Sequence, residues 1–413
     1  MSNPNDDLVS AVSAQAHAFP ESELRPEDLP PGLRSQLEDA SVIGLGEASH
    51  GTQEFFDLRF RLVRLLVESV GVRAIGFEAG FDPMCRVGKL VAAGEGDIRP
   101  AVEELGYRPF RTEPMLELLE WLQSYNASRP PEDRVRIYGF DTTVVEYASN
   151  GLRSFLERVD ADVDESLLAD LDTMTAGYDD EDERQAMLES ARRAHSTLAP
   201  LFRDHETAWV DATSRRAYDA ASHRLHLVDV QLDAHERDRE GRMALRDEAM
   251  AENAEWIQER TDGPIIVWGA NSHLGRGRHV LEEWDVDVPS MGEWLAASYG
   301  DGYCSIGLET ATGAVAAKDF SADEVVDYPI PDPPAGSISA VLGEVDDPVF
   351  WLRVDAGQND PAIREWLQGE PRRHNIWGGH PEGDNPVRYT DCSRGEFDWL
   401  LFVRETTPLV HLV

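Results

Sequence analysis

Lysine is almost absent from this chain. Lys89 and Lys318 are the only lysines among 413 residues, so nearly every positive charge is an arginine. There are 38 basic residues against 78 acidic ones, which gives a formal net charge of -40. Nucleic-acid binding depends on Lys and Arg that displace counterions from phosphates, and an anionic membrane repels an acidic surface. The composition argues against both kinds of partner and leaves a small-molecule substrate as the expected one.

The acidic residues are spread along the whole chain and are not gathered in a tail. Self-repulsion of this size destabilises a compact state in dilute buffer, and salt relieves it by screening. We therefore expect a halophilic protein, adapted to a salt-rich cytoplasm, whose fold loosens when salt is removed.

Cysteines are few, and long apolar runs are missing. Cys85, Cys304 and Cys392 are isolated and odd in number, which is typical of a reducing interior and argues against a disulfide framework or a cysteine zinc site. No stretch approaches the length of a transmembrane span. The N-terminal residues MSNPNDDLVSAV lack the basic and apolar regions of a secretory signal. These absences predict a soluble, cytoplasmic protein, and they leave its oligomeric state open.

Several familiar catalytic motifs are also missing. The chain has no G-x-S-x-G nucleophile elbow, no H-E-x-x-H zinc helix and no phosphate-binding P-loop. The run GLGEAS resembles the start of a dinucleotide-binding loop, but its third glycine is missing and Glu47 would face the pyrophosphate. We therefore expect no nicotinamide and no other organic cofactor, while a divalent metal stays open.

What the sequence does contain is a series of short apolar runs, each ending in glycine and polar residues. Their alternation predicts an α/β fold with a mostly parallel central sheet flanked by helices. The predicted strands cover residues 41–45, 73–77, 135–140, 264–268 and 303–308, and the predicted helices cover 53–69, 82–93 and 114–126. The run FDWLLFVRET is predicted as a last strand, and residues 319–348, dense in Asp, Pro and Gly, as surface loops.

Residues 151–260 show no convincing strand. They are rich in Ala, Leu, Arg and acidic residues, and Pro200 is their one proline. We interpret them as a long helical insertion of two or more antiparallel helices. The insertion belongs to the same domain as an α/β catalytic body formed by residues 1–150 and 261–413.

Polar side chains follow four of the predicted strands. In open α/β sheets, ligands bind beyond the carboxyl ends of the strands, so these side chains are expected along one rim. A core would not need them, and burying them unpaired would be costly. They are Glu47 and His50 after the first strand, Glu78 after the second, Asp141 after the third, and Asn271 and His273 after the fourth.

Some of these residues also have a purely structural interpretation. His50 could cap a helix, but its place beside Glu47 in a glycine-bounded loop favours a catalytic role. Glu47 could equally serve the positive end of the helix that follows. Asp141 more often forms a cap or a turn. The candidates for substrate binding are Arg111, Asp141, Asn271 and Arg86.

The same residues carry a resemblance to a known family. The run VIGLGEASHGTQEFFDLRFRLVRLLVESVGVRAIGFEAGF resembles the opening signature of the erythromycin-esterase-like family. Further similar runs, in family order, are RTEPMLELLEWLQSYN, VRIYGFD, RDEAMAENAEWI, PIIVWGANSHLG and PSMGEWLAASYGDGY. The resemblance implies an α/β body with a helical insertion and hydrolysis of an ester or lactone. Macrolide cleavage, with antibiotic resistance, gave the family its name, but a different ester, lactone or amide is an equally good expectation.

Carried over residue by residue, the resemblance makes His50 the general base. It implies that Glu47 and Glu78 orient His50 or position water, and that His273 completes the pocket. One position departs from the family pattern, which often reads tryptophan, any residue, histidine, asparagine, any residue, histidine. The first of those histidines is Ala270 here, so any group that it supplies to substrate or metal is lost.

The expected mechanism is direct attack by water. A neutral histidine suits a general base because its pKa lies near working pH, and a neighbouring carboxylate stabilises the imidazolium that forms. His273, Arg111 or loop N–H groups are the expected donors to the oxyanion. Two alternatives stay open: a divalent-metal hydrolase that uses His50, His273 and a glutamate, and a ligand-binding member of the family without turnover.

Overall fold

The computed structural model describes residues 4–21, 23–106, 108–142, 148–175, 180–281, 284–355, 357–358, 360–380 and 385–412. Its central sheet follows the order β1-β10-β14-β8-β2-β5-β3-β4. Six neighbouring strands of this path run parallel, while β1 and β10 are antiparallel additions at one edge. The predicted α/β class with a mostly parallel sheet is confirmed. Along the path the strands are β1 (His17–Ala18), β10 (Val349–Arg353), β14 (Trp399–Thr406), β8 (Tyr303–Asp319), β2 (Val42–Leu45), β5 (Ile265–Trp268), β3 (Ala74–Gly80) and β4 (Arg136–Asp141).

The central strands are short and buried on both faces. Every residue of β2, β3 and β5 is buried, which is why their sequences read as continuous apolar runs. Leu45 in β2 is in register with Trp268 in β5, and Trp268 is in register with Phe77 in β3. The segments that follow these strands therefore begin at the same edge of the sheet.

Helices cover both faces of the sheet. The helices α3 (Gln53–Leu65), α4 (Phe81–Ala93) and α6 (Glu113–Ala127) share one apolar core with Ile43 and Leu45. The opposite face, with Val42 and Val267, packs against α11 (Arg239–Gln258) and α13 (Met291–Tyr299). The remaining α-helices outside residues 148–258 are α1 (Pro4–Gln15), α2 (Pro31–Asp39), α5 (Arg99–Glu103), α12 (Asn271–Leu274), α14 (Ile338–Gly343) and α15 (Pro361–Gln368).

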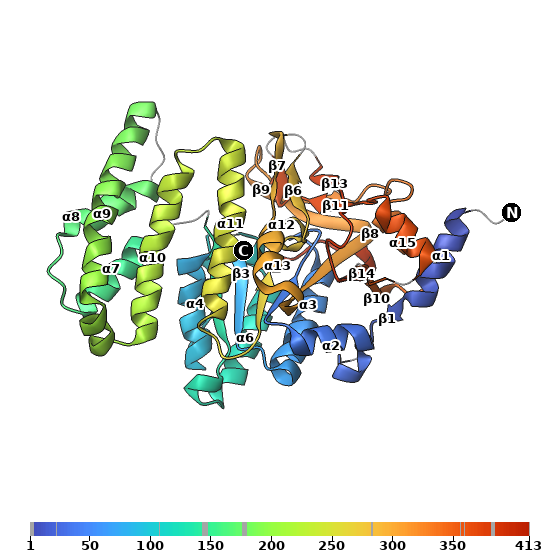
Figure 1. Cartoon of the computed structure of the whole chain (residues 1–413), viewed down its shortest axis with the longest axis horizontal. Helices are drawn as coiled ribbons and strands as arrows, with labels where there is room; N and C mark the ends of the chain where they lie inside the picture. The colour runs from blue at the N-terminus through green and yellow to red at the C-terminus, as the bar shows by residue number, and fades with distance from the viewer. Residues whose placement is uncertain are drawn as a thin grey trace.

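The segment predicted as a helical insertion is helical. The helices α7 (Ala148–Arg158), α8 (Glu165–Asp172), α9 (Glu181–Ala212) and α10 (Arg215–Ala234) form a bundle at one end of the molecule (Figure 1) with an apolar core of its own. The following helix, α11, packs on the sheet through Met250, Ala254 and Ile257. The division into a body and an insertion within one domain stays a prediction.

Two sequence predictions need correction. The predicted fifth strand, 303–308, is the start of a 17-residue strand, β8, that runs to Asp319. Residues 319–348 are not only loops, since they contain β9 (Glu324–Pro329), paired with β8, and the helix α14. Backbone pairing and a small apolar cluster around Val315 and Ile330 order this segment despite its Asp, Pro and Gly. Short strands that the sequence did not reveal are β6 (Arg278–Leu281), β7 (Val286–Pro289), β11 (Arg372–Ile376), β12 (Gly379–His380) and β13 (Val387–Asp391).

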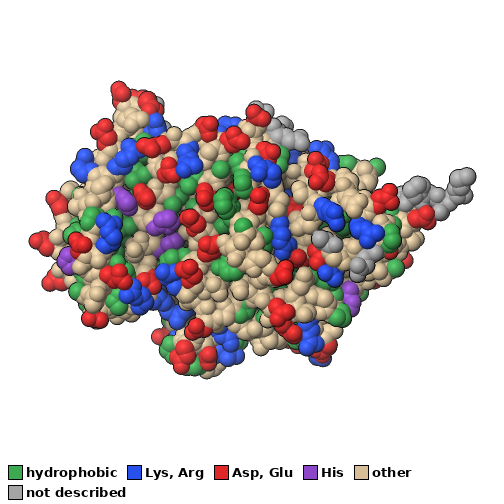
Figure 2. Space-filling model, viewed as in Figure 1, with side chains coloured by type: hydrophobic (Ala, Val, Ile, Leu, Met, Phe, Trp, Pro, Cys, Tyr) green, Lys and Arg blue, Asp and Glu red, His purple; other side chains and the backbone are tan. Residues whose placement is uncertain are grey.

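Acidic side chains are spread widely over the face of the molecule shown in Figure 2. Figure 2 shows Asp and Glu side chains scattered over the whole visible face, on the helical bundle as well as on the body. None of the described helices combines the length and the apolar character needed to span a membrane.

Candidate active site

The loop after β2 holds a histidine against a buried carboxylate. Nδ1 of His50 lies 2.8 Å from Oε1 of Glu47, and the other oxygen of Glu47 accepts a hydrogen bond from Arg59, which is fully buried in α3. Burial lowers the pKa of His50, but the charge and hydrogen bond of Glu47, with a contribution from Glu78, outweigh it and raise the pKa above its ordinary value. His50 therefore has one ring nitrogen fixed by Glu47 and the other, Nε2, turned to the site.

Two glycines allow this loop to lie so close to its neighbours. A Cβ on Gly46 would come within 2.3 Å of Oδ1 of Asn271, and one on Gly51 within 1.8 Å of the carbonyl oxygen of Ala316. Both approaches are far shorter than a van der Waals contact, so only glycine fits. The glycines that bound the GEASHG run thus seat Glu47 and His50 against β5 and β8.

Glu78, at the end of β3, lies between two histidines. Its Oε2 accepts the backbone N–H of Ala270 at 2.7 Å and lies 3.9 Å from Nε2 of His50. Its Oε1 lies 3.4 Å from Nε2 of His273. Burial raises the pKa of Glu78, but His273, His50 and Arg246 outweigh it and hold the pKa below its ordinary range. The side chain is therefore an ionised carboxylate at the centre of the site.

Arg246, from α11, connects the ends of three strands. Nε and Nη2 of Arg246 donate to the two carboxylate oxygens of Asp141, at 3.1 and 2.9 Å respectively. Nη2 also donates to Glu78 at 3.1 Å. Nη1 donates to Nε2 of His273 at 3.1 Å. Burial lowers the pKa of Arg246, but Asp141 and Glu78 raise it well above its ordinary value. These four bonds leave one N–H of Nη1 among the five donors of the guanidinium.

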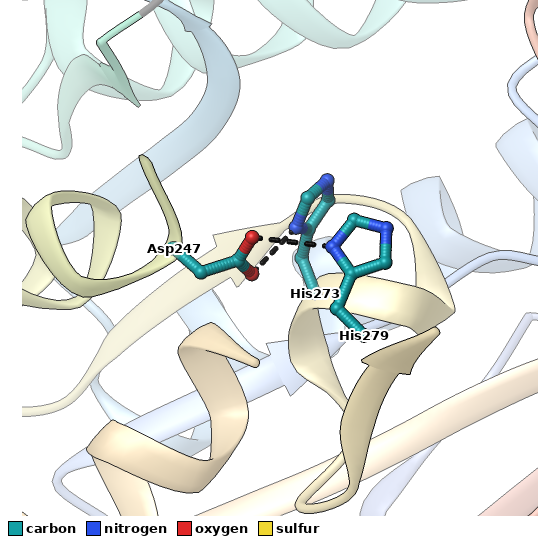
Figure 3. Close-up of side chains that lie close together, drawn as sticks. All are labelled: Asp247, His273 and His279. Atoms are coloured by element: carbon teal, nitrogen blue, oxygen red, sulfur yellow. Dashed lines mark hydrogen bonds and ion pairs between the residues drawn. The ribbon is translucent and has the colours of Figure 1, made fainter. Parts of the chain in front are cut away.

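Asp247, the next residue of α11, holds two histidines (Figure 3). Its Oδ1 lies 2.7 Å from Nδ1 of His273, its Oδ2 lies 3.2 Å from Nδ1 of His279, and Oδ1 also accepts the N–H of Met291 at 2.9 Å. Burial raises the pKa of Asp247, but the two histidines outweigh it and hold the pKa far below its ordinary value. Burial lowers the pKa of His279. Because His273 accepts from Arg246 at Nε2, its proton belongs on Nδ1, where it donates to Asp247.

His50 and His273 are held in the same way on either side of Glu78. His50 and His273 each have Nδ1 fixed by a buried carboxylate, and each directs Nε2 toward Glu78. Such carboxylate–histidine pairs fix the tautomer and orientation of the ring. At His50 this supports proton transfer at Nε2, whereas Nε2 of His273 lies against Arg246. A pocket lined by Glu47, Ser49, His50 and Ala270, among others, opens at this edge. The geometry is therefore that of a general acid–base site.

The structure gathers most of the predicted site residues but not all of them. Glu47, His50, Glu78, Asp141 and His273 form one network of hydrogen bonds and ion pairs. Asn271 lines the pocket and also ties the end of β5 to β8, since its amide bonds the backbone N–H and C=O of Leu308.

Arg86 and Arg111, both predicted to bind substrate, lie outside this network. Arg86 is exposed and pairs with Glu104 at 2.8 Å, because it lies on the side of α4 that faces solvent. Arg111 is half-buried and lines neither of the pockets that contain His50. Its neighbour Arg108, three residues earlier, lines one of them.

Four charged residues of the network were not picked out from the sequence. Two of them stand where an apolar residue of a helix would be expected. Arg59 continues the buried stripe of Phe55 and Leu62 in α3, and Asp247 continues the stripe of Met250 and Ala254 in α11. A charge inside an apolar helical stripe is the signal that could have found Arg59 and Asp247. The four residues are Arg59, Arg246, Asp247 and His279.

The cysteines take no part in this chemistry. Burial raises the pKa of all three thiols, that of Cys85 to about 12. A thiol with so high a pKa stays protonated at neutral pH and is a poor nucleophile.

The sheet and the site define a class of protein, an α/β protein with paired carboxylates and histidines at the carboxyl ends of its parallel strands. The sequence profile of the erythromycin esterase family matches residues 67–406, which contain Glu78, Asp141, Arg246, Asp247 and His273. The chain belongs to the erythromycin esterase family.

Similar proteins agree with this assignment. The Bacillus subtilis protein YbfO, whose description as a hydrolase is itself provisional, is 23% identical over 92% of this chain and 86% of its own length. Erythromycin esterase type II of Escherichia coli is 23% identical over 75% of this chain and 80% of its own. A crystal structure of a Bacillus cereus protein shares the fold with a TM-score of 0.82 and 22% identity, covering 100% of both chains.

Proposed function

We propose that this protein hydrolyses a carboxylic ester or lactone with a water molecule activated by His50. The observation that carries the proposal is the 2.8 Å contact between Nδ1 of His50 and buried Glu47, which leaves Nε2 as the nitrogen that takes a proton from water. Glu47 then stabilises the imidazolium that forms. The hydroxide adds to the carbonyl carbon, and His50 returns the proton to the departing alkoxide.

Arg246 supports the proposal as the source of positive charge. Its remaining Nη1 N–H can donate to the oxyanion that develops on the carbonyl oxygen. His273 holds Arg246 in place through Nε2. Glu78, held ionised, fixes the other side of the guanidinium at 3.1 Å and can orient the attacking water.

The test is hydrolysis of a panel of esters and lactones that includes erythromycin, in molar KCl, with and without EDTA. We expect turnover that survives EDTA and that falls by about 10³-fold in His50→Ala, the range expected for a general base. His205→Ala, on an exposed face of α9, is the matched control and should keep full activity. Full activity in His50→Ala would refute the mechanism.

A second candidate is a metal-dependent hydrolase. Among the described residues, one group of potential ligands has all its ligand atoms within 4.8 Å of one another, namely Asp247, His273 and His279. His50, which the sequence suggested as a ligand, is not part of it. The donor types suit Zn²⁺, but a cation would have to displace the N–H groups that now bond Asp247. Loss of turnover in EDTA, restored by one defined ion, would favour this candidate.

A third candidate is a ligand-binding protein without turnover. Ala270, in place of the family histidine, is the observation that favours it. Tight binding of a panel compound with no product formed would support it.

A further inference from the structure

A second pocket lies beside His50, and its lining is cationic. Arg108 and Lys318 line it together with the imidazoles of His50 and His411. The other lining residues are proline, alanine, valine and glycine, and no carboxylate is among the residues that line it. A ligand that reaches His50 from this side meets positive charge and apolar surface.

This lining is unusual for so acidic a chain. Acidic residues outnumber basic ones by 78 to 38, and Lys318 is one of only two lysines. A random patch of this surface would contain more carboxylates than cations. Local charge of one sign in a concave site concentrates ligands of the opposite sign, so the pocket is suited to an anion even though the whole protein repels one at long range.

Three separate segments bring these groups together. Arg108 begins the 3-10 turn Arg108–Phe110 that precedes α6, and Lys318 lies near the end of β8, where it pairs with Gly379 of β12. His411 forms a backbone bridge with Thr112. The position of the pocket is thus set by the main fold and not by one surface loop.

A carboxylate of the chain already pairs with one of the two cations that line this pocket. Nζ of Lys318 forms an ion pair with Asp323, whose side chain is 76% exposed, and Arg108 also acts on Asp323 electrostatically. Asp323 lies in the turn between β8 and β9 and does not line the pocket. The two cations therefore act together on one carboxylate, and a substrate carboxylate can replace an exposed partner at small cost, since exposed ion pairs contribute little.

We propose that Arg108 and Lys318 bind an acidic group of the substrate, a carboxylate in the simplest case, so that the ester presented to His50 belongs to an anionic molecule. The inference rests on the proposed function, because it places that group relative to His50. The planar fork of Arg108 suits two carboxylate oxygens, and Lys318 adds a point charge. The apolar residues of the lining receive the carbon chain between the acid and the ester.

The test compares two chromogenic esters, neutral 4-nitrophenyl acetate and the anionic half-ester mono-4-nitrophenyl glutarate, at one fixed KCl concentration. We expect kcat/KM to be about tenfold higher for the half-ester. Arg108→Gln and Lys318→Gln should each lower the ratio of the two kcat/KM values about tenfold, mainly through KM of the half-ester. Lys89→Gln, which removes the other lysine, should leave the ratio unchanged. A wild-type ratio near one, or a ratio that neither variant alters, would overturn the proposal.

Absence of any hydrolysis can be distinguished from absence of an anion-binding site by a separate binding experiment. If the wild type cleaves neither ester, the proposed function fails, and the pocket is tested by calorimetric titration with glutarate. Binding to the wild type and to Lys89→Gln, lost in the Arg108→Gln/Lys318→Gln double variant, would support the anion site. No binding of glutarate to the wild type would overturn it.

Discussion

Oδ1 of Asp247 lies 2.7 Å from Nδ1 of His273. The same carboxylate fixes His279 and the N–H of Met291, so one buried charge links α11, α12, β6 and the start of α13. Asp247 fixes Nδ1 of His273 in the same way that Glu47 fixes Nδ1 of His50. Changes at Asp247 should therefore affect both the site and the fold.

Asp247→Asn keeps the size of the side chain and removes its charge. Because Nδ1–H of His273 loses its charged acceptor, we expect kcat/KM to fall by about 10²-fold, less than the loss seen when the carboxylate of a Ser-His-Asp triad is neutralised. The melting temperature should also fall, since the buried donors are then poorly satisfied. Asp229→Asn, at an exposed position of α10, should change neither quantity. Unaltered kinetics in Asp247→Asn would show that His273 needs no carboxylate.

The acid side of the pH–rate profile should report His50. Its pKa is raised by Glu47, and only the neutral ring accepts a proton, so activity should be lost as pH falls through a value above about 6.5. Glu47→Gln removes the charge that stabilises the imidazolium, so the acid limb should move to lower pH. Exposed Glu68→Gln is the control. An acid limb at the same pH in Glu47→Gln would contradict the pairing.

Arg246→Lys keeps the positive charge and removes the planar fork. Lysine cannot bond both oxygens of Asp141 while also donating to Glu78 and His273, so we expect kcat to fall by roughly 10 to 10²-fold. The matched control is Arg242→Lys, one turn earlier on the exposed side of α11. Equal kcat values for the two variants would indicate that charge alone is required at position 246.

Salt should stabilise the fold. A net charge of -40, spread over the visible surface (Figure 2), repels itself, and the Debye length shrinks from about 30 Å at 0.01 M to about 3 Å at 1 M. The melting temperature should therefore rise from millimolar to molar KCl, and NaCl should act alike because the effect is screening. A melting temperature that is independent of salt would remove the halophilic interpretation.

Much of the fold could be predicted from the sequence because its signals are local. A strand buried on both faces has to be apolar throughout, so VIGL and PIIVW could be recognised directly. Their parallel alternation with amphipathic helices then placed Glu47, His50, Glu78, Asp141 and His273 at one rim. The strands β9 and β11 were missed because they lack the continuous apolar run of a strand that is buried on both faces; β9 pairs with the end of β8 across a short turn, and β11 pairs with β13.

What the sequence by itself determined is the class of fold, the acidic surface and the histidines and carboxylates at the strand ends, since each follows from composition or from periodicity of nearby residues. Only the tertiary structure decided how these groups pair. It paired Glu47 with His50 and Asp247 with His273, brought Arg246 into contact with Glu78 and Asp141, and placed Arg108 and Lys318 in the lining of one pocket. The physical reason is that an ion pair depends on a few ångströms between side chains, and folding sets that distance between residues as far apart in the chain as Glu78 and His273, which are 195 positions apart.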